Sequence, residues 1–372
     1  MSEFRSAVDR LLAGAQEVDS PSELQPLGQA VLALLPIASP KELDEAVKSL
    51  IGAIDPEHAE ASGWLAITAG SIIEEGTDPS ALANLFIEFL PVVIQRATAF
   101  GEFALTHALS PEASQEIEDD SGGEWLGDRF LPPEQVSVIA NEQPDGADAW
   151  AAIWLWFMPA VACFTRDLHL RKQAIASLPP VQRLSELNGH AQCLSVLLSV
   201  LDDEPFLVFH PATDQGYRMR VSGVADNFQL HLLLADTLIQ PSAWLPRTAT
   251  GLPGVRPHPV VASIARGDGP QESDVTSYGV WDLYNWTALL TNGRLPAEVP
   301  TEHWIWGEGI PADIEQFGEF RVVLLGPPSY PRFWNTARYF GALRASIVVE
   351  EAFSASDTRD WLRQLGTAVG RS

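Results

Sequence analysis

The chain has 372 residues, of which 46% are hydrophobic, a composition typical of folded proteins with large buried cores and not of disordered ones. Its 49 acidic and 23 basic side chains give a formal net charge of −26, which makes direct binding to nucleic acid unfavourable. Only three of the basic residues are lysines, an arginine bias associated with GC-rich bacterial genomes.

The start of the chain, MSEFRSAVDRLLAGAQ, lacks the apolar core of a secretory signal, so we expect a cytoplasmic protein. The longest uncharged apolar stretch, residues 149–165, contains Pro159 and is shorter than a usual transmembrane helix. We therefore expect a buried helix there and no membrane contact. Cys163 and Cys193 lie in apolar sequence, which predicts buried free thiols and argues against a disulfide framework or a cysteine-based zinc site.

The acidic charge is concentrated in the first half of the chain. Residues 1–204 hold 32 acidic and 10 basic side chains, a net charge of −22, whereas residues 205–372 hold 17 and 13, a net charge of −4. Between Ile51 and Asp128, Arg96 is the only basic residue against 15 acidic ones. Such a surface attracts a cationic protein surface, although a high net charge also keeps a protein soluble without any partner.

The first half has five places where a short polar residue precedes a proline at the start of an apolar periodic segment. The polar side chain accepts hydrogen bonds from first-turn N–H groups of a helix, and proline at the next position has no N–H to leave unpaired. The pairs are Ser20-Pro21, Ser39-Pro40, Asp55-Pro56, Asp78-Pro79 and Ser110-Pro111. The predicted helices lie near residues 3–15, 21–35, 40–53, 57–75, 79–109, 145–165 and 179–201.

Two of these helix starts have the complete capping-box pattern, in which Ser20 is followed by Glu23 and Ser39 by Glu42. The starts recur at irregular intervals, which is consistent with antiparallel helices joined by short loops and not with a regular repeat. The first half therefore predicts a helical bundle or an irregular helical stack.

Two features should interrupt this helical half. Pro91 and Gly101 are expected to bend or split the longest helix. Residues 114–127, SQEIEDDSGGEWLG, are acidic and contain glycine, which predicts a solvated loop that could divide the half into two lobes. Trp125 in this loop is a candidate anchor or a candidate contact with a partner.

The clearest architectural signal is the segment 206–239. FLVFH is an unbroken apolar run, and after a turn YRMRVSG alternates, so that Tyr217, Met219 and Val221 share one face. This pattern predicts an antiparallel hairpin with one buried side. Asp226 then has the spacing of a helix N-cap, so a helix should follow the hairpin and pack on it.

The middle of the second half is harder to assign. Residues 241–272 are rich in proline and glycine and predict loops with one strand-like run, PVVASIA. The later segment EHWIWGEG predicts a strand with Glu302, Trp304, Trp306 and Glu308 on one face.

The end of the chain predicts the order strand, helix, strand, helix. FRVVLLG and RASIVVEE are the expected strands, RFWNTARYFGAL between them is an expected helix, and a final helix should begin at Ser356. A crossover of this kind would place at least one pair of strands in parallel.

These patterns together predict an α+β multidomain protein. An N-terminal all-α helical bundle or irregular helical stack would occupy residues 1–204, with the break at 114–127. A smaller mixed α/β sheet domain would occupy residues 205–372.

Motifs that identify common enzyme sites are absent. The sequence has no HExxH, GxSxG, CxxC, EF-hand loop or full GxGxxG, and no lysine follows Lys172, which excludes a P-loop or a Schiff-base lysine in the second half. We expect no cofactor and assign no metal site. The remaining catalytic candidates are His210, Asp226 and His231, because imidazole and carboxylate groups can act as general bases or metal ligands. Their spacing does not bring them together, and the alternative is that His231 is a partly buried residue with one hydrogen bond.

Tryptophan is unusually frequent, with 12 residues. Trp304 and Trp306 could stack on a sugar or another flat ligand, or anchor a protein partner, since tryptophan is enriched in interface hot spots. Core packing is the alternative. Glu302 and Glu308 beside them resemble the paired carboxylates of glycosidases only weakly.

Three functional hypotheses follow from these residues. The leading one is a non-catalytic protein-interaction or scaffold protein whose acidic half binds a basic protein surface. The second is a hydrolase or metal-assisted enzyme with its site at His210, Asp226 and His231. The third is a protein that binds a small ligand or a glycan by tryptophan stacking.

Overall fold

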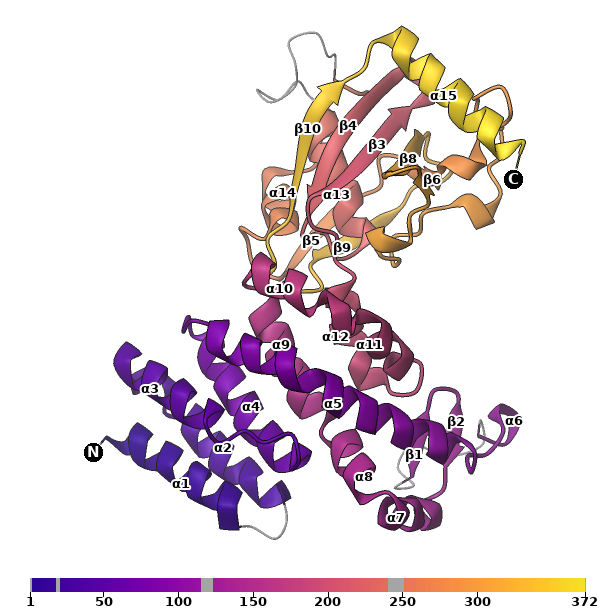
Figure 1. The fold of residues 1–372 in the computed structure, drawn as a ribbon. Coiled ribbons are helices and arrows are strands. Elements are labelled where there is room, and N and C mark those ends of the chain that lie inside the picture. Colours follow the sequence, from indigo (N-terminus) through magenta and orange to yellow (C-terminus); the bar gives the residue numbers. More distant parts are fainter. Residues whose placement is uncertain (1, 18–20, 115–122, 240–250, 372) are drawn as a thin grey trace. The chain divides into compact units, whose positions relative to one another are not determined.

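The computed structural model describes residues 2–17, 21–114, 123–239 and 251–371. They fall into two compact units, Met1–Leu198 and Ser199–Ser372, a division a few residues before the expected boundary at residue 204. The first unit is mainly helical and the second contains a mixed sheet with helices, which confirms the predicted α+β class (Figure 1).

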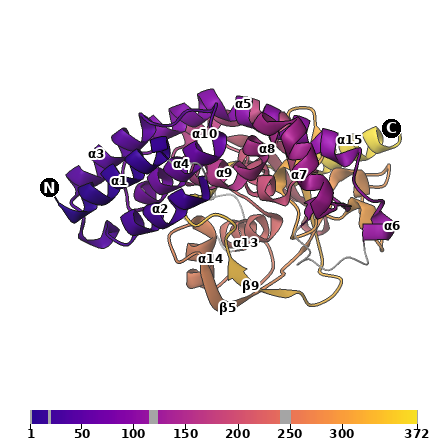
Figure 2. The same cartoon turned by 90° about the horizontal axis from the view of Figure 1, so that it is seen from below.

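The helical unit consists of α-helices joined by short loops and 3-10 turns (Figures 1 and 2). The first six α-helices are α1 Glu3–Glu17, α2 Leu24–Leu32, α3 Pro40–Ile51, α4 Ala59–Glu74, α5 Ser80–Leu105 and α6 Pro111–Ser114. The next six are α7 Pro133–Glu142, α8 Pro144–Ala151, α9 Ile153–Phe164, α10 Leu168–Ala174, α11 Leu178–Ser185 and α12 Gln192–Leu198. Because α4 packs against α9, and α5 packs against α8 and α9, segments far apart in the sequence share one core.

The helix starts follow the local hydrogen-bond signals in the sequence. At α3, the Ser39 hydroxyl accepts from the Glu42 N–H, and the Glu42 carboxylate accepts from the Ser39 N–H at 2.9 Å, which confirms the capping box. Before α5, the Asp78 carboxylate accepts from the Ser80 N–H at 2.9 Å. The other expected capping box involves Ser20, which lies outside the described residues.

The described part of the helical unit contains a strand pair that the sequence did not predict. β1 (Glu124–Leu126) and β2 (Arg129–Leu131) form an antiparallel hairpin, so the expectation of an all-α first half is wrong at this point. The hairpin is stabilised by burial of Phe130, whose backbone also bridges to Leu109 in the segment that follows α5. The predicted loop 114–127 therefore ends in a strand, and residues 115–122 of it lie outside the described residues.

α5 runs through Pro91 and Gly101 without a break, so the expected split does not occur. The helix buries a continuous apolar stripe in the unit, and this packing outweighs the hydrogen bond that proline removes. Gly101 has a packing role, because a Cβ atom there would lie 2.6 Å from the Trp150 ring. The predicted helix ranges do not include α6, α7 and α10, and α7 buries only Ile139.

Among the described residues, α5 is the helix that is long and apolar enough to span a membrane by length and composition. The bent pair of α8 and α9 would also qualify if it were a single span. Within the unit, α9 packs against α4 and α5 and buries most of its side chains, as expected of the buried helix predicted at 149–165.

Both cysteines are free thiols, but the predicted burial applies fully to Cys163 alone. Cys163 is buried and Cys193 is half-buried. Burial raises the pKa of Cys163 to about 12 and also raises the pKa of Cys193. Since the thiolate is the reactive form, neither residue has the environment of a catalytic cysteine.

The second unit is organised around a six-stranded sheet in the order β10-β4-β3-β8-β6, with β7 paired to the start of β8. Its strands are β3 Glu204–His210, β4 Gln215–Ser222, β6 Asp282–Asn285, β7 Gln316–Phe317, β8 Phe320–Gly326 and β10 Ser346–Ala352. A separate antiparallel pair consists of β5 Glu272–Tyr278 and β9 Phe333–Ala337. The helices are α13 Asn227–Leu238, α14 Pro259–Arg266 and α15 Ala355–Val369.

Helices cover both faces of this sheet (Figure 1). On one face, Phe206 and Val208 of β3 belong to a core shared with α13 and α14. On the other face, Leu207 and Phe209 belong to a second core that includes Leu362 of α15. β3 is therefore buried on both sides, which explains why FLVFH is an unbroken apolar run.

The predicted hairpin is confirmed as β3 and β4, and α13 follows it with Asp226 as its N-cap. Other expectations for this unit are wrong. PVVASIA forms helix α14, because the His258 ring accepts from the Val260 N–H and Pro259 occupies the first helical position. RFWNTARYFGAL contains strand β9 and no helix, and EHWIWGEG forms a 3-10 turn and a loop. The sheet does contain a parallel pair, as expected, but it joins β3 with β8.

Candidate functional site

His210, Asp226 and His231 do not come together. His210 ends β3, whereas Asp226 lies beyond the opposite end of the same hairpin, so roughly 20 Å of strand separates them. His231 lies within α13 and contacts Val280 and Trp281. No group of three His, Cys, Asp or Glu residues in the described parts of the chain could hold a metal ion.

His231 links α13 to the segment that precedes β6. Its ring is buried, and Nε2 accepts hydrogen bonds from the N–H groups of Val280 at 3.1 Å and Trp281 at 3.3 Å. The residue is therefore more buried than predicted and makes two hydrogen bonds where one was expected. Burial and the nearby positive charge of Arg332 lower the pKa of His231 to about 3, so the ring is neutral near neutral pH.

The other two residues also have local partners. The Asp226 carboxylate accepts from the Gln229 N–H at 2.7 Å, and burial raises the pKa of Asp226 to about 6 in spite of this hydrogen bond. The His210 ring lies 2.8 Å from the Thr213 hydroxyl, and burial lowers the pKa of His210. The structure thus gives each residue a stabilising role and assembles no catalytic pair from them.

We expect His231 to make the protein less stable as the pH falls. The pKa of His231 is about 3 in the folded state, below its ordinary value of 6.5. Its contribution to stability is therefore complete above pH 6.5 and is lost as the pH falls toward 3. Acidification from about pH 7 to about pH 5 should remove about 2 kcal/mol through this residue. The variant His231→Gln lacks this loss. Its free energy of unfolding, measured with urea, should therefore rise by about 2 kcal/mol relative to that of the wild type between about pH 7 and about pH 5.

Asp226 provides a control of opposite sign. The pKa of Asp226 is raised from 3.8 to about 6 in the folded state. Its contribution to stability is therefore complete below pH 3.8 and is lost as the pH rises through about 6. Asp226→Asn keeps a capping oxygen. On the same acidification its free energy of unfolding should fall by about 1 kcal/mol relative to that of the wild type. Parallel pH profiles for the wild type and His231→Gln would show that His231 is not the source of the acid sensitivity.

Trp304 and Trp306 are stacked in the structure and are joined by a third ring. The centroids of the two indoles lie 5.1 Å apart with 27° between their planes, and the Tyr330 ring lies 6.3 Å from Trp304 at 17°. Trp306 and Tyr330 are 45% and 49% exposed. Trp304 is half-buried, donates from Nε1 to the Val299 carbonyl at 3.0 Å and meets the Tyr284 ring edge-on. Trp304, Trp306 and Tyr330 are called the aromatic cluster below.

The first turn of α13 holds the loop that carries Trp306. The Asn227 N–H donates to the Gly309 carbonyl at 2.9 Å, and Asn227 Nδ2 donates to the Trp306 carbonyl at 2.8 Å. The Phe228 N–H donates to the Gly307 carbonyl at 3.0 Å. A side chain at position 307 would displace the Phe228 ring, because a Cβ atom there would lie 2.2 Å from it. Helix N–H groups that lack partners within the helix therefore fix the backbone of this loop.

A buried ion pair adjoins the aromatic cluster. The Asp282 carboxylate is fully buried and lies 2.8 Å from the Arg332 guanidinium. It also accepts from the Ser329 N–H at 2.7 Å, from the Ser329 hydroxyl at 2.6 Å and from the Tyr284 hydroxyl at 3.2 Å. The Arg332 guanidinium lies 6.0 Å from the centre of the Tyr330 ring, so the pair contributes to the placement of that ring.

The remaining predicted contact residues lie in different surroundings. Glu302 is in a 3-10 turn and Glu308 in the following loop, both exposed, so the common strand face on which the comparison with glycosidases depended does not exist. Trp125 lies in β1, is 36% exposed and packs edge-on against Phe130 at 5.3 Å.

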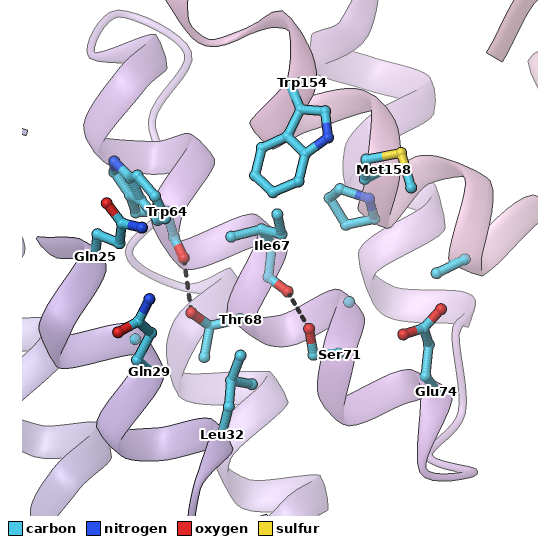
Figure 3. Close-up of a pocket in the computed structure, with 14 residues that line it drawn as sticks. Gln25, Gln29, Leu32, Trp64, Ile67, Thr68, Ser71, Glu74, Trp154 and Met158 are labelled. Carbon is cyan, nitrogen blue, oxygen red and sulfur yellow. Dashed lines mark hydrogen bonds between the residues drawn. The ribbon is translucent and has the colours of Figure 1, made fainter. Parts of the chain in front are cut away.

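The helical unit contains a groove of about 360 Å³ between α2, α4 and α9 (Figure 3). Its apolar wall is formed by Trp64 and Ile67 of α4 and by Trp154 and Met158 of α9. Trp154 and Met158 lie one helical turn apart and are 43% and 38% exposed. A volume of this size lies at the lower end of the range for small-ligand pockets.

Glycine residues let the helices approach each other beside the groove. A Cβ atom at Gly70 of α4 would lie 2.4 Å from Cβ of Pro159 in α9, and one at Gly28 of α2 would lie 3.0 Å from the Thr68 hydroxyl. The three helices are therefore in close contact at these positions. Gly28, Gly70 and Pro159 also line the groove itself.

The polar groups of the groove include both acceptors and donors, because Gln25, Gln29, Trp64 and Trp154 carry N–H groups. The hydroxyls of Thr68 and Ser71 donate to backbone carbonyls one turn earlier, at 2.8 and 3.0 Å, which leaves their oxygens able to accept (Figure 3). The Gln25 and Gln29 side chains lie along α2, and the Glu74 carboxylate is exposed at the end of α4. No lysine or arginine lines the groove as described.

The sequence pattern pointed to Trp304 and Trp306 but not to Tyr330, Asp282 and Arg332. These three lie on segments that meet only because β6 pairs with β8 and the chain then turns back past it. The groove was missed for the same reason, since each of its helices supplies only part of the wall. The available signal was the presence of a tryptophan in each of the apolar helices α4 and α9, Trp64 and Trp154.

Comparisons with protein-family models, with curated proteins and with solved structures gave no match to this chain. The groove, the aromatic cluster and the charge distribution are therefore the grounds for a functional proposal.

Proposed function

We propose that this chain is a non-catalytic protein-interaction protein of a bacterial cytoplasm, and that its acidic helical unit binds a cationic partner in the groove. The observation that carries the proposal is an exposed apolar pair, Trp154 and Met158, beside Trp64 in a unit of strongly negative charge. Residues 1–198 hold 29 acidic and 10 basic side chains, a net charge of −19.

The residue types in the groove fit a protein contact. Tryptophan is enriched in interface hot spots, and methionine adapts its shape to different apolar partners. Exposed apolar groups that lie together on a surface mark interaction sites more often than isolated ones do. An amphipathic helix could place one apolar side chain between Trp154 and Trp64, in the manner of other helices that bind in grooves.

The polar groups of the groove favour a basic partner. Glu74 and the amide and hydroxyl acceptors can receive hydrogen bonds from lysine or arginine side chains, which are donors only. The indole faces of Trp64 and Trp154 also attract cations. A basic amphipathic segment therefore matches the groove in both its apolar and its polar parts, and an acidic segment would be repelled.

The test is the binding of two fluorescent amphipathic peptides, one of leucine and lysine and one in which glutamate replaces each lysine. The lysine peptide should bind and the glutamate peptide should not, and an increase from about 50 mM to about 500 mM salt should weaken the complex. Trp154→Ala should weaken binding by at least about tenfold, because truncation of a central tryptophan typically costs more than about 1.4 kcal/mol.

Val138→Ala is the matched control, since Val138 is 56% exposed on α7 and does not line the groove. This variant should bind the lysine peptide like the wild type. Equal binding of both peptides, or unchanged binding by Trp154→Ala, would contradict the proposal.

The aromatic cluster is a second candidate contact, in the sheet-containing unit. Trp306 and Tyr330 expose ring faces that are nearly parallel to Trp304, and such faces suit stacking on a sugar, a flat ligand or a partner side chain. Quenching of tryptophan fluorescence by a soluble glycan or a nucleobase, lost in Trp306→Ala, would assign ligand binding to this cluster.

A further inference from the structure

The sheet-containing unit has a separate pocket of about 640 Å³ that none of the functional hypotheses uses. Its walls come from the turn after β3, from the loop 290–297, from the end of β8 and from α15. β3 and β8 are the parallel pair of the sheet, so the pocket lies outside their carboxyl ends. Ligands of α/β proteins bind preferentially at this edge of a sheet.

Three arginines line this pocket, although the chain as a whole is strongly acidic. Arg359 and Arg363 lie one turn apart on α15, and Arg294 belongs to the loop 290–297. Arg359 pairs with Asp214 at 2.7 Å, and Arg363 pairs with Asp360. No acidic side chain in the described residues pairs with Arg294, so the three guanidiniums outnumber their carboxylate partners.

The loop that presents Arg294 is tightly folded against α15. The Leu290 N–H donates to the Arg294 carbonyl at 2.8 Å, and the Gly293 N–H donates to the Leu290 carbonyl at 2.8 Å. Gly293 has a φ of +78°, and a Cβ atom there would lie 2.6 Å from the Leu362 carbonyl of α15. The Arg294 N–H also donates to the Asn292 side chain at 3.0 Å. Arg294 and the two arginines of α15 are thus held on one rigid support.

The remainder of the pocket is largely apolar. Leu295, Leu325 and Leu362 line it together with Pro296 and Pro327. The pocket therefore combines a cationic rim with a surface that can bury an organic group. Binding sites for small molecules commonly have this composition, with a few placed polar groups that fix the orientation of the ligand.

We propose that this pocket binds a small organic phosphate, with the phosphate at the three arginines and the organic group against the leucines. Guanidinium groups bind phosphate through paired, charge-assisted hydrogen bonds. A phosphate monoester has three terminal oxygens, so it can accept from Arg294 and from α15 at the same time, whereas a planar carboxylate suits a single guanidinium fork. The Asp214 carboxylate keeps Arg359 oriented while leaving most of its N–H groups able to donate.

The experiment measures the binding of phenyl phosphate to the full chain by isothermal titration calorimetry. Inorganic phosphate should bind more weakly, because it lacks the organic group, and benzoate should bind more weakly, because it lacks the phosphate. Arg294→Gln should reduce the affinity for phenyl phosphate about tenfold. Arg363→Gln, on the exposed face of α15, should give a similar loss and does not depend on the fold of the loop.

Arg344→Gln is the matched control, because Arg344 is an exposed arginine of the same unit that pairs with Asp268 away from the pocket. It should bind phenyl phosphate like the wild type. Absence of saturable binding, an unchanged affinity in both Arg294→Gln and Arg363→Gln, or tighter binding of benzoate would overturn the proposal. None of these variants alters the groove of the helical unit. The phosphate-binding proposal and the peptide-binding proposal can therefore be refuted independently of each other.

Discussion

Asp282→Ala should lower the free energy of unfolding of the sheet-containing unit by about 3–5 kcal/mol. Asp282 is fully buried and forms an ion pair with Arg332, whose side chain is only 19% exposed. The substitution leaves that guanidinium without its counter-charge and removes the acceptor of the Ser329 N–H and hydroxyl. Unpaired buried groups of this kind carry the full cost of desolvation. Urea unfolding monitored by tryptophan fluorescence would measure the loss.

Two variants test whether the unpaired charge is the cause. The double substitution Asp282→Ala with Arg332→Met should recover at least about half of the lost stability, because an apolar side chain of similar length leaves no charge to solvate. Asp268→Ala, which breaks the exposed ion pairs with Arg344 and Arg266, should cost less than about 1 kcal/mol. A single Asp282→Ala variant as stable as Asp268→Ala would contradict the assigned role of the buried pair.

The elements that the sequence predicted correctly are those specified by near neighbours. The capping box at Ser39 and the N-cap at Asp226 depend on residues three positions apart. The final helix was expected at Ser356 and begins at Ala355 after the Ser354 cap, for the same reason. The alternation of β4 was also informative, because one face of that strand is buried and the other is not. Local hydrogen bonds and local periodicity were sufficient for these elements.

The errors occur where the structure depends on distant partners. The segment RFWNTARYFGAL has apolar positions that suit either a helix or a strand, and β5 decides the outcome by pairing with it. The pairing buries Ser277 and Thr336, whose hydroxyls are in contact with each other. Arg338, just after the strand, is buried and donates to the carbonyls of Gly341 and Gly269. No short window of sequence contains the residues that make β9 a strand.

The candidate sites were predictable only in part, for the same physical reason. Trp304 and Trp306 are close in sequence, so their proximity could be anticipated, although the loop that stacks them could not. Tyr330 and Arg332 reach the aromatic cluster through the pairing of β6 with β8. The arginine-lined pocket needs Arg294 to meet α15, which begins some sixty residues later. The amino-acid composition indicated which residue types are unusually frequent. The strand pairing and the chain topology determine which of those residues lie close together.

Gly223→Ala should lower the free energy of unfolding by at least about 3 kcal/mol, because two separate costs fall on one position. Gly223 has a φ of +68°, a conformation that L side chains adopt with a cost of about 1–2 kcal/mol. A Cβ atom there would also lie 1.9 Å from the Arg344 carbonyl oxygen, so the backbone before β10 would have to move. Gly223 connects β4 to the Asp226 cap and donates its N–H to the Leu201 carbonyl at 2.9 Å. The loss would be measured by urea unfolding.

Gly318→Ala separates the two costs, because Gly318 has a nearly identical φ of +63° in the turn between β7 and β8 but no atom within 4 Å of an added Cβ. Only the conformational term applies there, so this variant should lose about 1–2 kcal/mol. The difference between the two variants then measures how tightly the chain before β10 is packed on the end of β4. If both variants lost the same free energy of unfolding, the segment around Arg344 could move to accommodate the Cβ atom without an energetic cost. The junction between the hairpin and α13 would then not need a glycine for packing.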